Sequence, residues 1–244
     1  MGNNTAGDMG GILFNTGGTV TIRGSYMVNS EANGGGAIYS LNSSPDVTLT
    51  VIRSAIRSNR ANGNGGGFYL ASNTTIVNST FSNNTAKNSR GGALYAIFPT
   101  TIESSTFNEN RADQGGAIWR EPSANPMSLK NTIVAGSLEW SSNSPSLNCD
   151  GPTMASEGRN IIDDNSCLPN PGSSGDKFST DPLLGFWLAP RIRGYVPAAN
   201  SPAVNYGAGC PAVDQRGMPR PIGSACDVGA IERGFQIFLP LLRR

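Results

Sequence analysis

Three kinds of side chain could carry chemistry in this sequence: carboxylates, guanidinium groups and indoles. Histidine is absent from all 244 residues. Its absence excludes a Ser-His-Asp triad, an imidazole general base and a histidine metal site. Glycoside hydrolysis remains a possibility to weigh, because it generally needs only two carboxyl groups ~5–9.5 Å apart. The acidic residues before position 148 are Asp8, Glu31, Asp46, Glu103, Glu109, Asp113, Glu121 and Glu139.

Two other groups of side chains have both a ligand-binding and a structural interpretation. Asp163-Asp164, and Asp214 with Asp227, offer the oxygen ligands that Ca²⁺ prefers, but such residues also make turn and cap hydrogen bonds. We favour the hydrogen bonds and expect no cofactor, with Ca²⁺ as the alternative. Trp119 and Trp140 could stack on sugar rings. They do not share a position in the repeats of this chain, so we favour isolated packing or partial exposure.

Composition limits the classes of partner. Lys plus Arg is 18 and Asp plus Glu is 17, so the net charge is +1, and charged residues make up only 14% of the chain. There is no basic surplus to bind phosphates, so we expect no nucleic-acid partner. No run of ~18 apolar residues predicts a membrane-spanning helix. Glycine, at 31 residues, is nearly twice as frequent as the usual ~7%.

The elements that must position these side chains are repeats of about 25 residues. One block is a glycine pair followed by an apolar or small residue, and a second is an apolar residue followed three positions later by Asn. The glycine block occurs at Gly10-Gly11-Ile12, Gly35-Gly36-Ala37, Gly66-Gly67-Phe68, Gly91-Gly92-Ala93 and Gly115-Gly116-Ala117. The second block occurs at Tyr26…Asn29, Ile56…Asn59, Phe81…Asn84 and Phe107…Asn110. Two blocks with one period indicate a repeat architecture.

Short β-branched segments between turn residues, such as 19–22 and 74–77, predict strands. A unit this small buries its apolar face only by stacking on identical neighbours. The sequence therefore predicts an all-β, right-handed parallel β-helix of pectate-lyase-like architecture, with five to six coils over 1–147. Two structural ladders are expected: Ile56, Phe81 and Phe107 inside, and Asn59, Asn84 and Asn110 at a bend. Asn there tolerates a left-handed backbone and can bond to the next coil.

Beyond the coils the pattern changes. Residues 42–46 predict a loop inserted into one coil. Residues 148–232 lose the period and are predicted to form an irregular cap over the open end of the helix, where unpaired strand edges would otherwise associate. Residues 233–244 form a short apolar tail, for which a sorting tag and a final edge strand remain open.

Four cysteines fall in the predicted cap. Sequential pairing, Cys149 with Cys167 and Cys210 with Cys226, closes two short loops and is the pairing we expect. Each bond would contribute on the order of 3 kcal/mol, and both would place the protein in an oxidising compartment. Four free thiols are the alternative.

Within this frame, the sequence offers little for catalysis. A carboxylate pair would have to come from equivalent positions of adjacent coils, and no two acids share one: Val77, and before it Ile52 or Arg53, occupy the position of Glu103, whose side chain we expect to point outward. Lyases of this shape use calcium held by an Asp cluster and an Arg or Lys base. Arg53, Arg57 and Arg60 form a basic cluster, but no acidic cluster clearly faces it.

Two family resemblances follow from these motifs. Gly115-Gly116-Ala117-Ile118, with the Phe81 to Asn84 and Phe107 to Asn110 pairs, resembles the chlamydial polymorphic outer membrane protein repeat. The later part resembles bacterial choice-of-anchor Q surface proteins. The blocks that carry this second resemblance are 181–185, 201–203, 214–221 and 226–230. Asn205 and Ile231 depart from its usual pattern. Together the resemblances imply a right-handed parallel β-helix that is secreted or displayed on a bacterial surface, with no established enzymatic activity.

Our expectation is therefore a non-catalytic, adhesin-like or structural β-helix that contacts cell-surface glycan or protein. The localisation expected is extracellular or at the bacterial cell surface or outer membrane. The first residues do not read as a signal peptide, so we expect a processed chain or a fragment lacking upstream coils. A polysaccharide lyase or hydrolase with part of its site in such coils is the alternative, and an ice-binding solenoid a weaker one. Monomer and end-to-end association both remain open.

Overall fold

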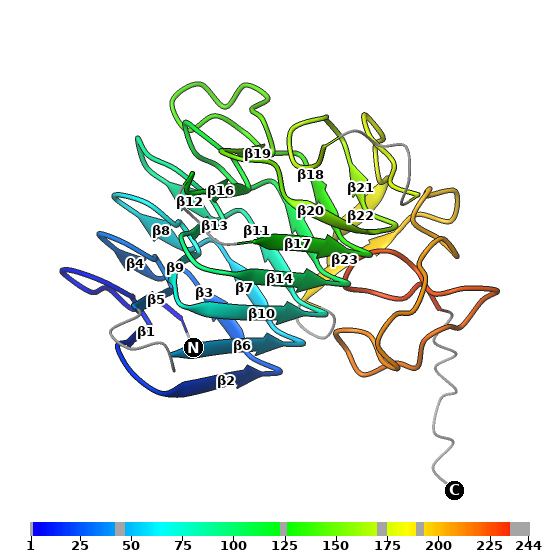
Figure 1. Ribbon diagram of the computed structural model, residues 1–244, viewed down its shortest axis with the longest axis horizontal. Helices are drawn as coiled ribbons and strands as arrows, with labels where there is room; N and C mark the ends of the chain where they lie inside the picture. Colours follow the sequence, from blue (N-terminus) through cyan, green and yellow to red (C-terminus); the bar gives the residue numbers. More distant parts are fainter. Residues whose placement is uncertain (1, 42–46, 123–125, 170–174, 189–192, 235–244) are drawn as a thin grey trace, which may run out of the picture.

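The computed structural model describes residues 2–41, 47–122, 126–169, 175–188 and 193–234. Within these ranges the chain is all-β and contains no helix. Three parallel six-stranded sheets run along a stack of coils, so each coil contributes one strand to each sheet (Figure 1). The predicted parallel β-helix is confirmed. Six coils at the ~4.8 Å strand spacing make a stack of roughly 24 Å.

The first sheet contains β1 (Leu13–Asn15), β5 (Ile38–Leu41), β9 (Phe68–Ala71), β13 (Leu94–Ala96), β16 (Ile118–Arg120) and β19 (Cys149–Asp150). The second contains β2 (Thr19–Arg23), β6 (Thr48–Ile52), β10 (Asn73–Val77), β14 (Thr100–Glu103), β17 (Met127–Lys130) and β20 (Ala155–Gly158). The third, which we call the flank sheet, contains β3 (Tyr26–Val28), β7 (Ala55–Arg57), β11 (Thr80–Ser82), β15 (Thr106–Asn108), β18 (Ile133–Ala135) and β21 (Ile161–Ile162). A short fourth sheet contains β4 (Glu31–Ala32), β8 (Arg60–Ala61) and β12 (Thr85–Ala86).

The interior is built by stacking like residues. Ile56 pairs with Phe81, and Phe81 with Phe107, in the flank sheet. All three side chains are fully buried, and the two phenyl rings stack with centroids 4.9 Å apart. In the first coil Met27 occupies this position. The expected Tyr26…Asn29 block is therefore out of register by one residue, and Ser30 takes the place of Asn.

The asparagine ladder runs along the bend after the flank sheet. The side-chain nitrogen of Asn59 donates to Oδ1 of Asn84. The side-chain nitrogen of Asn84 donates in the same way to Oδ1 of Asn110, and both distances are 3.0 Å. The left-handed backbone lies at the residue before each ladder Asn, at Ser58 and Asn83 among others, and not at the ladder residue itself as expected. A buried amide in this position joins two coils and satisfies its own polar atoms.

A second polar ladder borders the other end of the flank strands, and the sequence analysis missed it. The hydroxyl of each Ser accepts a hydrogen bond from the backbone N–H of the equivalent Ser one coil earlier. The N–H of Ser54 donates to Ser79, and the N–H of Ser79 donates to Ser105. Thr132 and Asn160 continue the series. The repeat is thus Ser-x-apolar-x-x-Asn, which the sequence itself displays at Ser79 to Asn84 and Ser105 to Asn110.

Glycine is required where coils touch backbone to backbone. Gly35 has φ of 58°, and its equivalents in neighbouring coils share this left-handed conformation. A Cβ on Gly36 would lie 2.2 Å from the carbonyl oxygen of Gly66. In the third coil the left-handed residue is Gly65, because Ile38 pairs with Phe68, so the glycine block there starts one residue earlier than the sequence analysis placed it.

The parallel stack extends past residue 147, where we expected it to end. Strands β19, β20 and β21 pair in parallel with β16, β17 and β18. The Cys149–Cys167 disulfide, with an S–S distance of 1.97 Å, holds the loop that follows this last coil. Cys167, Leu168 and Met154 pack into the coil interior, and so they cover the end of the core.

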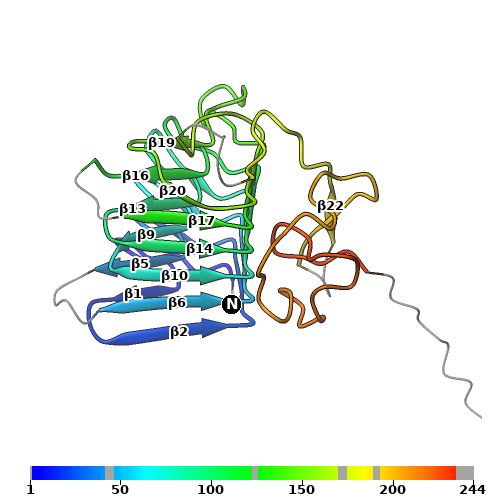
Figure 2. The same cartoon turned by 45° about the vertical axis from the view of Figure 1, so that its right-hand side comes forward.

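Residues 181–188 and 193–234 form what we call the lateral module. It begins with the antiparallel hairpin of β22 (Leu184–Leu188) and β23 (Gly194–Pro197). The prediction of one cap over the end is wrong for this part: the module lies alongside the coils, outside the flank sheet (Figure 2). It packs there because Ile133 and Ile161 point outward from the flank sheet. Both side chains are buried against Ala203 and Val228 of the module.

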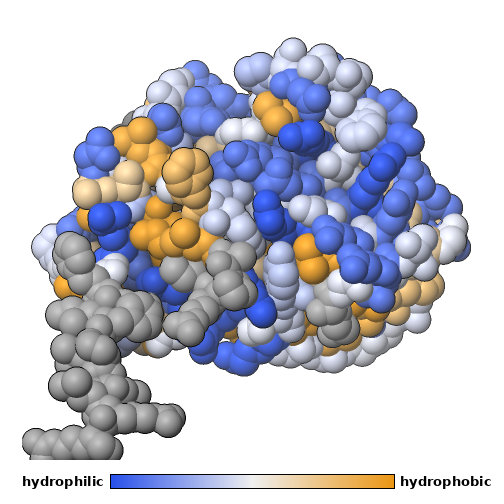
Figure 3. Space-filling model, turned by 180° about the vertical axis from the view of Figure 1, so that it is seen from behind, coloured by the Kyte–Doolittle hydropathy of each residue, from blue (hydrophilic) through white to orange (hydrophobic). Residues whose placement is uncertain are grey.

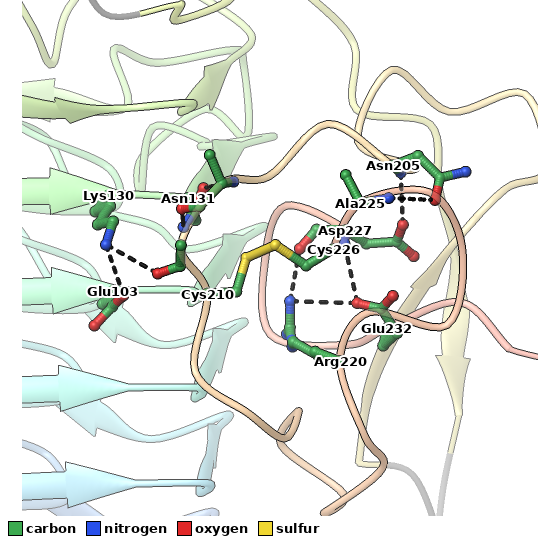
Figure 4. Close-up of a disulfide and its surroundings, with 12 residues drawn as sticks. Glu103, Lys130, Asn131, Asn205, Cys210, Arg220, Ala225, Cys226, Asp227 and Glu232 are labelled. Carbon is green, nitrogen blue, oxygen red and sulfur yellow. Dashed lines mark hydrogen bonds and ion pairs between the residues drawn. A yellow bond between two sulfur atoms is a disulfide. The ribbon is translucent and has the colours of Figure 1, made fainter.

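Hydrogen bonds tie the lateral module to several coils. Asn78 donates to the carbonyl of Val213 at 2.8 Å, and Lys130 donates to that of Gly209 at 3.0 Å. Inside the module the Cys210–Cys226 disulfide lies close to a buried charged group (Figure 4). Arg220, 8% exposed, donates to the carbonyl oxygens of Asp227 and Gly229 and lies 3.7 Å from Glu232.

Both disulfides follow the sequential pairing that the sequence predicts. They do not, however, share one cap, because the first closes the coil stack and the second belongs to the lateral module. The inserted loop expected at 42–46 lies outside the described residues, as do all but the first two residues of the tail expected at 233–244. Within the described part, no helix is available to cross a bilayer.

Candidate functional site

A groove of about 450 Å³ lies between the flank sheet and the hairpin of the lateral module. The coil side supplies Arg57, Asn108, Glu109, Ala135, Gly136 and Asp163, and the module supplies Asp181, Pro182, Leu184, Gly185, Phe186, Trp187 and Tyr195. Carboxylates, an amide and aromatic rings therefore meet here from segments far apart in the sequence. We call this the hairpin groove.

The coil wall of the hairpin groove is a ladder of equivalent positions. Arg57 pairs with Ser82, Ser82 with Asn108, and Asn108 with Ala135, all at the last position of a flank strand. These side chains point out of the coil because their neighbours Ile56, Phe81 and Phe107 point in. The wall is therefore straight and follows the axis of the stack.

The hairpin wall is aromatic. Trp187 stacks on Tyr26 with centroids 6.5 Å apart, meets Tyr195 edge to face at 5.4 Å, and has the Arg57 guanidinium 4.7 Å from its ring centre. These contacts anchor the hairpin to the coils. Phe186, the neighbour of Trp187 on the strand, points the other way and is 92% exposed. It leaves a free aromatic ring at the edge of the groove.

Apolar residues also gather elsewhere on the lateral module. From behind, most of the surface is hydrophilic, with apolar patches on the side where the module lies (Figure 3). Leu188 and Ile222, which are 40% and 45% exposed, line a second depression there together with Arg216 and Arg233. Two of its lining residues, Leu188 and Gly234, are the last residues of described ranges, so the hairpin groove is the better-defined site.

Hydrogen bonds fix the orientation of Glu109. Its Oε2 accepts the amide of Asn83 at 3.1 Å and the phenol of Tyr195 at 3.3 Å. Burial raises the pKa of Tyr195, while hydrogen bonds with Asn108 and Ser82 oppose this shift. The phenol therefore stays protonated at neutral pH and acts as a donor to the carboxylate.

Asp163 lies two coils further along the stack. One of its oxygens accepts the backbone N–H of Gly136 at 2.7 Å, and the other accepts the amide of Asn148. Gly136 separates Asp163 from Glu109 and has no side chain to fill the space between them. A Cβ there would lie 3.2 Å from Oδ1 of Asn108. The glycine lets the backbone pass close to Asn108 between two oriented carboxylates.

The three arginines of the basic cluster do not converge. Arg53 donates to the carbonyl of Gln215 in the lateral module, and Arg57 faces Trp187 in the hairpin groove. Arg60 lies 3.9 Å from Glu31 of the preceding coil. Glu103, expected to point outward, pairs with Lys130 at 3.3 Å. The cluster is thus divided among three separate contacts.

The aspartates considered for calcium all accept hydrogen bonds from the protein. Asp164 accepts the backbone N–H of Asn148. Asp214 accepts the backbone N–H of Glu232, and Asp227 that of Asn205. Within the residues that the structure describes, no group of three or more Cys, Asp or Glu side chains is placed to hold a metal ion.

Trp119 belongs to an aromatic ladder that the sequence analysis missed. It pairs with Tyr95, which stacks on Tyr69 at 4.9 Å, and Tyr69 stacks on Tyr39 at 4.2 Å. Trp140 is elsewhere, over Arg60. Because Tyr39, Tyr95 and Trp119 are each at most 8% exposed, this ladder stiffens the first sheet and offers little ring face to a ligand.

The hairpin groove was also missed, although the sequence carries a signal for it. The outward first positions of the flank strands, Ala55, Thr80, Thr106, Ile133 and Ile161, are small or apolar. A strand facing water on one side normally alternates apolar with charged or strongly polar residues. The small or apolar character of these residues indicates that another part of the chain covers this face of the flank sheet. The hairpin groove lies along the edge of the covering lateral module.

Comparison with known families gives one result. A sequence model of the Chlamydia polymorphic membrane protein repeat matches residues 78–97 and 104–119. The chain carries this repeat. The matched segments contain β11, β12, β13, β15, the first two residues of β16 and both Ser-x-apolar-x-x-Asn motifs of the central coils, so the polymorphic membrane protein repeat corresponds to the ladders described above. No curated protein and no solved structure matches the chain.

Proposed function

We propose that this chain is a non-catalytic, surface-associated β-helix protein that binds glycan in the hairpin groove, in an adhesin-like role. The polymorphic membrane protein repeat supports the surface association. The observation that carries glycan binding is that Phe186, which is 92% exposed, borders the same groove as Asn108 and Glu109. Sugars present an apolar face of C–H groups and a rim of hydroxyls. An aromatic ring and oriented polar groups match both.

The groove also suits a chain-like ligand in its dimensions. Arg57 belongs to the second coil and Asp163 to the sixth, so its lining spans four strand spacings, or roughly 19 Å. Its wall is rigid because the ladder residues behind it are fully buried. A preformed groove of this kind binds without the entropy loss of ordering a loop.

Isothermal titration calorimetry with a panel of soluble oligosaccharides tests the proposal. We expect Phe186→Ala to weaken binding roughly 5- to 150-fold, taking as the scale for a stacked sugar ring the about 1–3 kcal/mol of a base stacked on an aromatic side chain. Leu147→Ala is the matched control, because Leu147 is 57% exposed and does not line the groove. Absence of binding across the panel, or equal binding by both variants, overturns the proposal.

A polysaccharide lyase or hydrolase is the second candidate, and one observation favours it: Glu109 and Asp163 line the same groove on either side of Gly136. Incubation of the purified chain with a polysaccharide panel, with and without calcium, separates the two functions. Formation of unsaturated products or new reducing ends, lost in Glu109→Gln and Asp163→Asn, would replace the non-catalytic proposal. We expect no product.

A further inference from the structure

The charges around the hairpin groove are unevenly distributed. Glu109, Asp163 and Asp181 all line it, and all three are exposed to solvent. Arg57 is the one cationic residue in the described lining, and it is half-buried with its guanidinium against the Trp187 ring. The chain as a whole is close to neutral, at +1. The groove is therefore a local negative region on a nearly uncharged protein.

From this asymmetry we infer that the hairpin groove selects cationic amino sugars over neutral sugars, and rejects uronic acids. The inference rests on the proposed glycan binding and adds the chemical class of the ligand. An amino sugar bears an ammonium group on a ring that still has an apolar face. Phe186 offers stacking to the ring, and the carboxylates offer ion pairs to the ammonium.

Gly136 indicates where the ammonium is placed. The position that a Cβ would take at Gly136 lies 3.2 Å from Oδ1 of Asn108 and 3.7 Å from Cγ of Glu109, and the Gly136 N–H holds the Asp163 carboxylate. The hydrogen bonds to Glu109 and Asp163 hold both groups in place before a ligand arrives. Preorganised carboxylates lose little side-chain entropy on pairing. A uronic acid in the same place would face two like charges, which disfavours it.

Both carboxylates face solvent, so each ion pair is expected to be modest and sensitive to salt. Two such pairs predict a preference of roughly tenfold for an amino sugar over its neutral counterpart at low ionic strength. The preference should shrink as salt rises, while stacking on Phe186 persists. Salt dependence thus separates the charge contribution from the rest of the binding energy.

Three oligosaccharide probes of equal length test the inference: a glucosamine oligomer, its N-acetylated form and an oligogalacturonate. The first two share a backbone and differ in charge at the nitrogen. We expect the glucosamine oligomer to bind about tenfold more tightly than the N-acetylated form, and the oligogalacturonate to bind most weakly. Glu109→Gln with Asp163→Asn should remove the difference between the first two probes and leave binding of the neutral oligomer in place.

Asp113→Asn is the matched control, because Asp113 is an exposed carboxylate that does not line the groove. It should leave all three affinities unchanged. Equal binding of the glucosamine and N-acetylated oligomers overturns the inference but not the proposed function. Binding of none of the probes overturns both. A glucosamine preference that survives in the double variant, or that Asp113→Asn also reduces, assigns the attraction to another surface and overturns the inference.

Discussion

Replacing Asn84 by alanine should be among the most damaging single changes in the coil stack. Asn84 is fully buried. Its amide oxygen accepts the backbone N–H and the side-chain amide of Asn59, at 3.1 and 3.0 Å. Its nitrogen donates to the carbonyl of Ile56 at 2.9 Å and to Asn110 at 3.0 Å. Alanine removes all four bonds and leaves the N–H of Asn59 buried without an acceptor.

An unsatisfied buried N–H costs about 1–3 kcal/mol, and the other lost bonds add about 0.5–1.5 kcal/mol each. We therefore expect Asn84→Ala to lower the free energy of unfolding by about 3–5 kcal/mol, measured by urea denaturation followed by tryptophan fluorescence. Asn62→Ala is the control. Asn62 is exposed, and its one side-chain bond across coils is long, at 3.4 Å. A loss below ~1 kcal/mol for Asn84→Ala, or equal losses for both variants, would refute the idea that the amide ladder joins the coils.

Three further predictions address the glycine bend, the disulfides and the tyrosine ladder. Gly36→Ala should lower stability by at least about 1–3 kcal/mol by overpacking, whereas Gly17→Ala, which has nothing within 4 Å of the added Cβ, should have little effect; equal unfolding midpoints would contradict this. Replacing Cys149 and Cys167 by serine should expose the last coil to hydrogen exchange, and replacing Cys210 and Cys226 should expose the lateral module, each with a loss on the order of 3 kcal/mol; the same exchange pattern in both variants would count against their separate locations. Burial, followed by the hydrogen bond to Glu121, raises the pKa of Tyr95 to about 12. The folded state thus binds the phenolic proton more tightly than the unfolded state, so the stability from Tyr95 is fully present below pH ~10 and is lost as the pH rises towards ~12. Tyr95→Phe should flatten this part of the pH–stability curve, and an unchanged slope would argue against it.

The sequence predicts the coils well because their pattern is repetitive. A side chain at Phe81 stacks on its equivalent at Phe107, so one period specifies both the contact and the register. The errors fall where the repeat is imperfect. Three consecutive glycines at 65–67 allow two alignments of the glycine block. In the first coil, Met27 stands at the ladder position that Ile or Phe occupies in later coils, so the pattern is harder to recognise. In both cases strand pairing, which is not visible in one sequence, decides the register.

The lateral module and the hairpin groove could not be predicted in this way. Asn78 contacts Val213, which is 135 residues away, and no period connects the two. The apolar outer positions of the flank sheet show that something covers them, but not which segment. Glu109 and Asp163 stood in the sequence as isolated acids, and only the docked hairpin brings Phe186 and Tyr195 beside them.

The attachment of the lateral module also changes how the protein is expected to unfold. A bare stack of coils behaves as a one-dimensional chain of nearest-neighbour units, so its ends fray and an opening can begin at any coil. Here one module stacks on Tyr26 in the first coil and bonds to Arg53 in the second and to Lys130 in the fifth. Opening any coil between them also strains contacts two or three coils away. The coils that contact the module should therefore open as a single cooperative unit, with partial unfolding confined to the segment before Tyr26 and to the loop beyond the last coil.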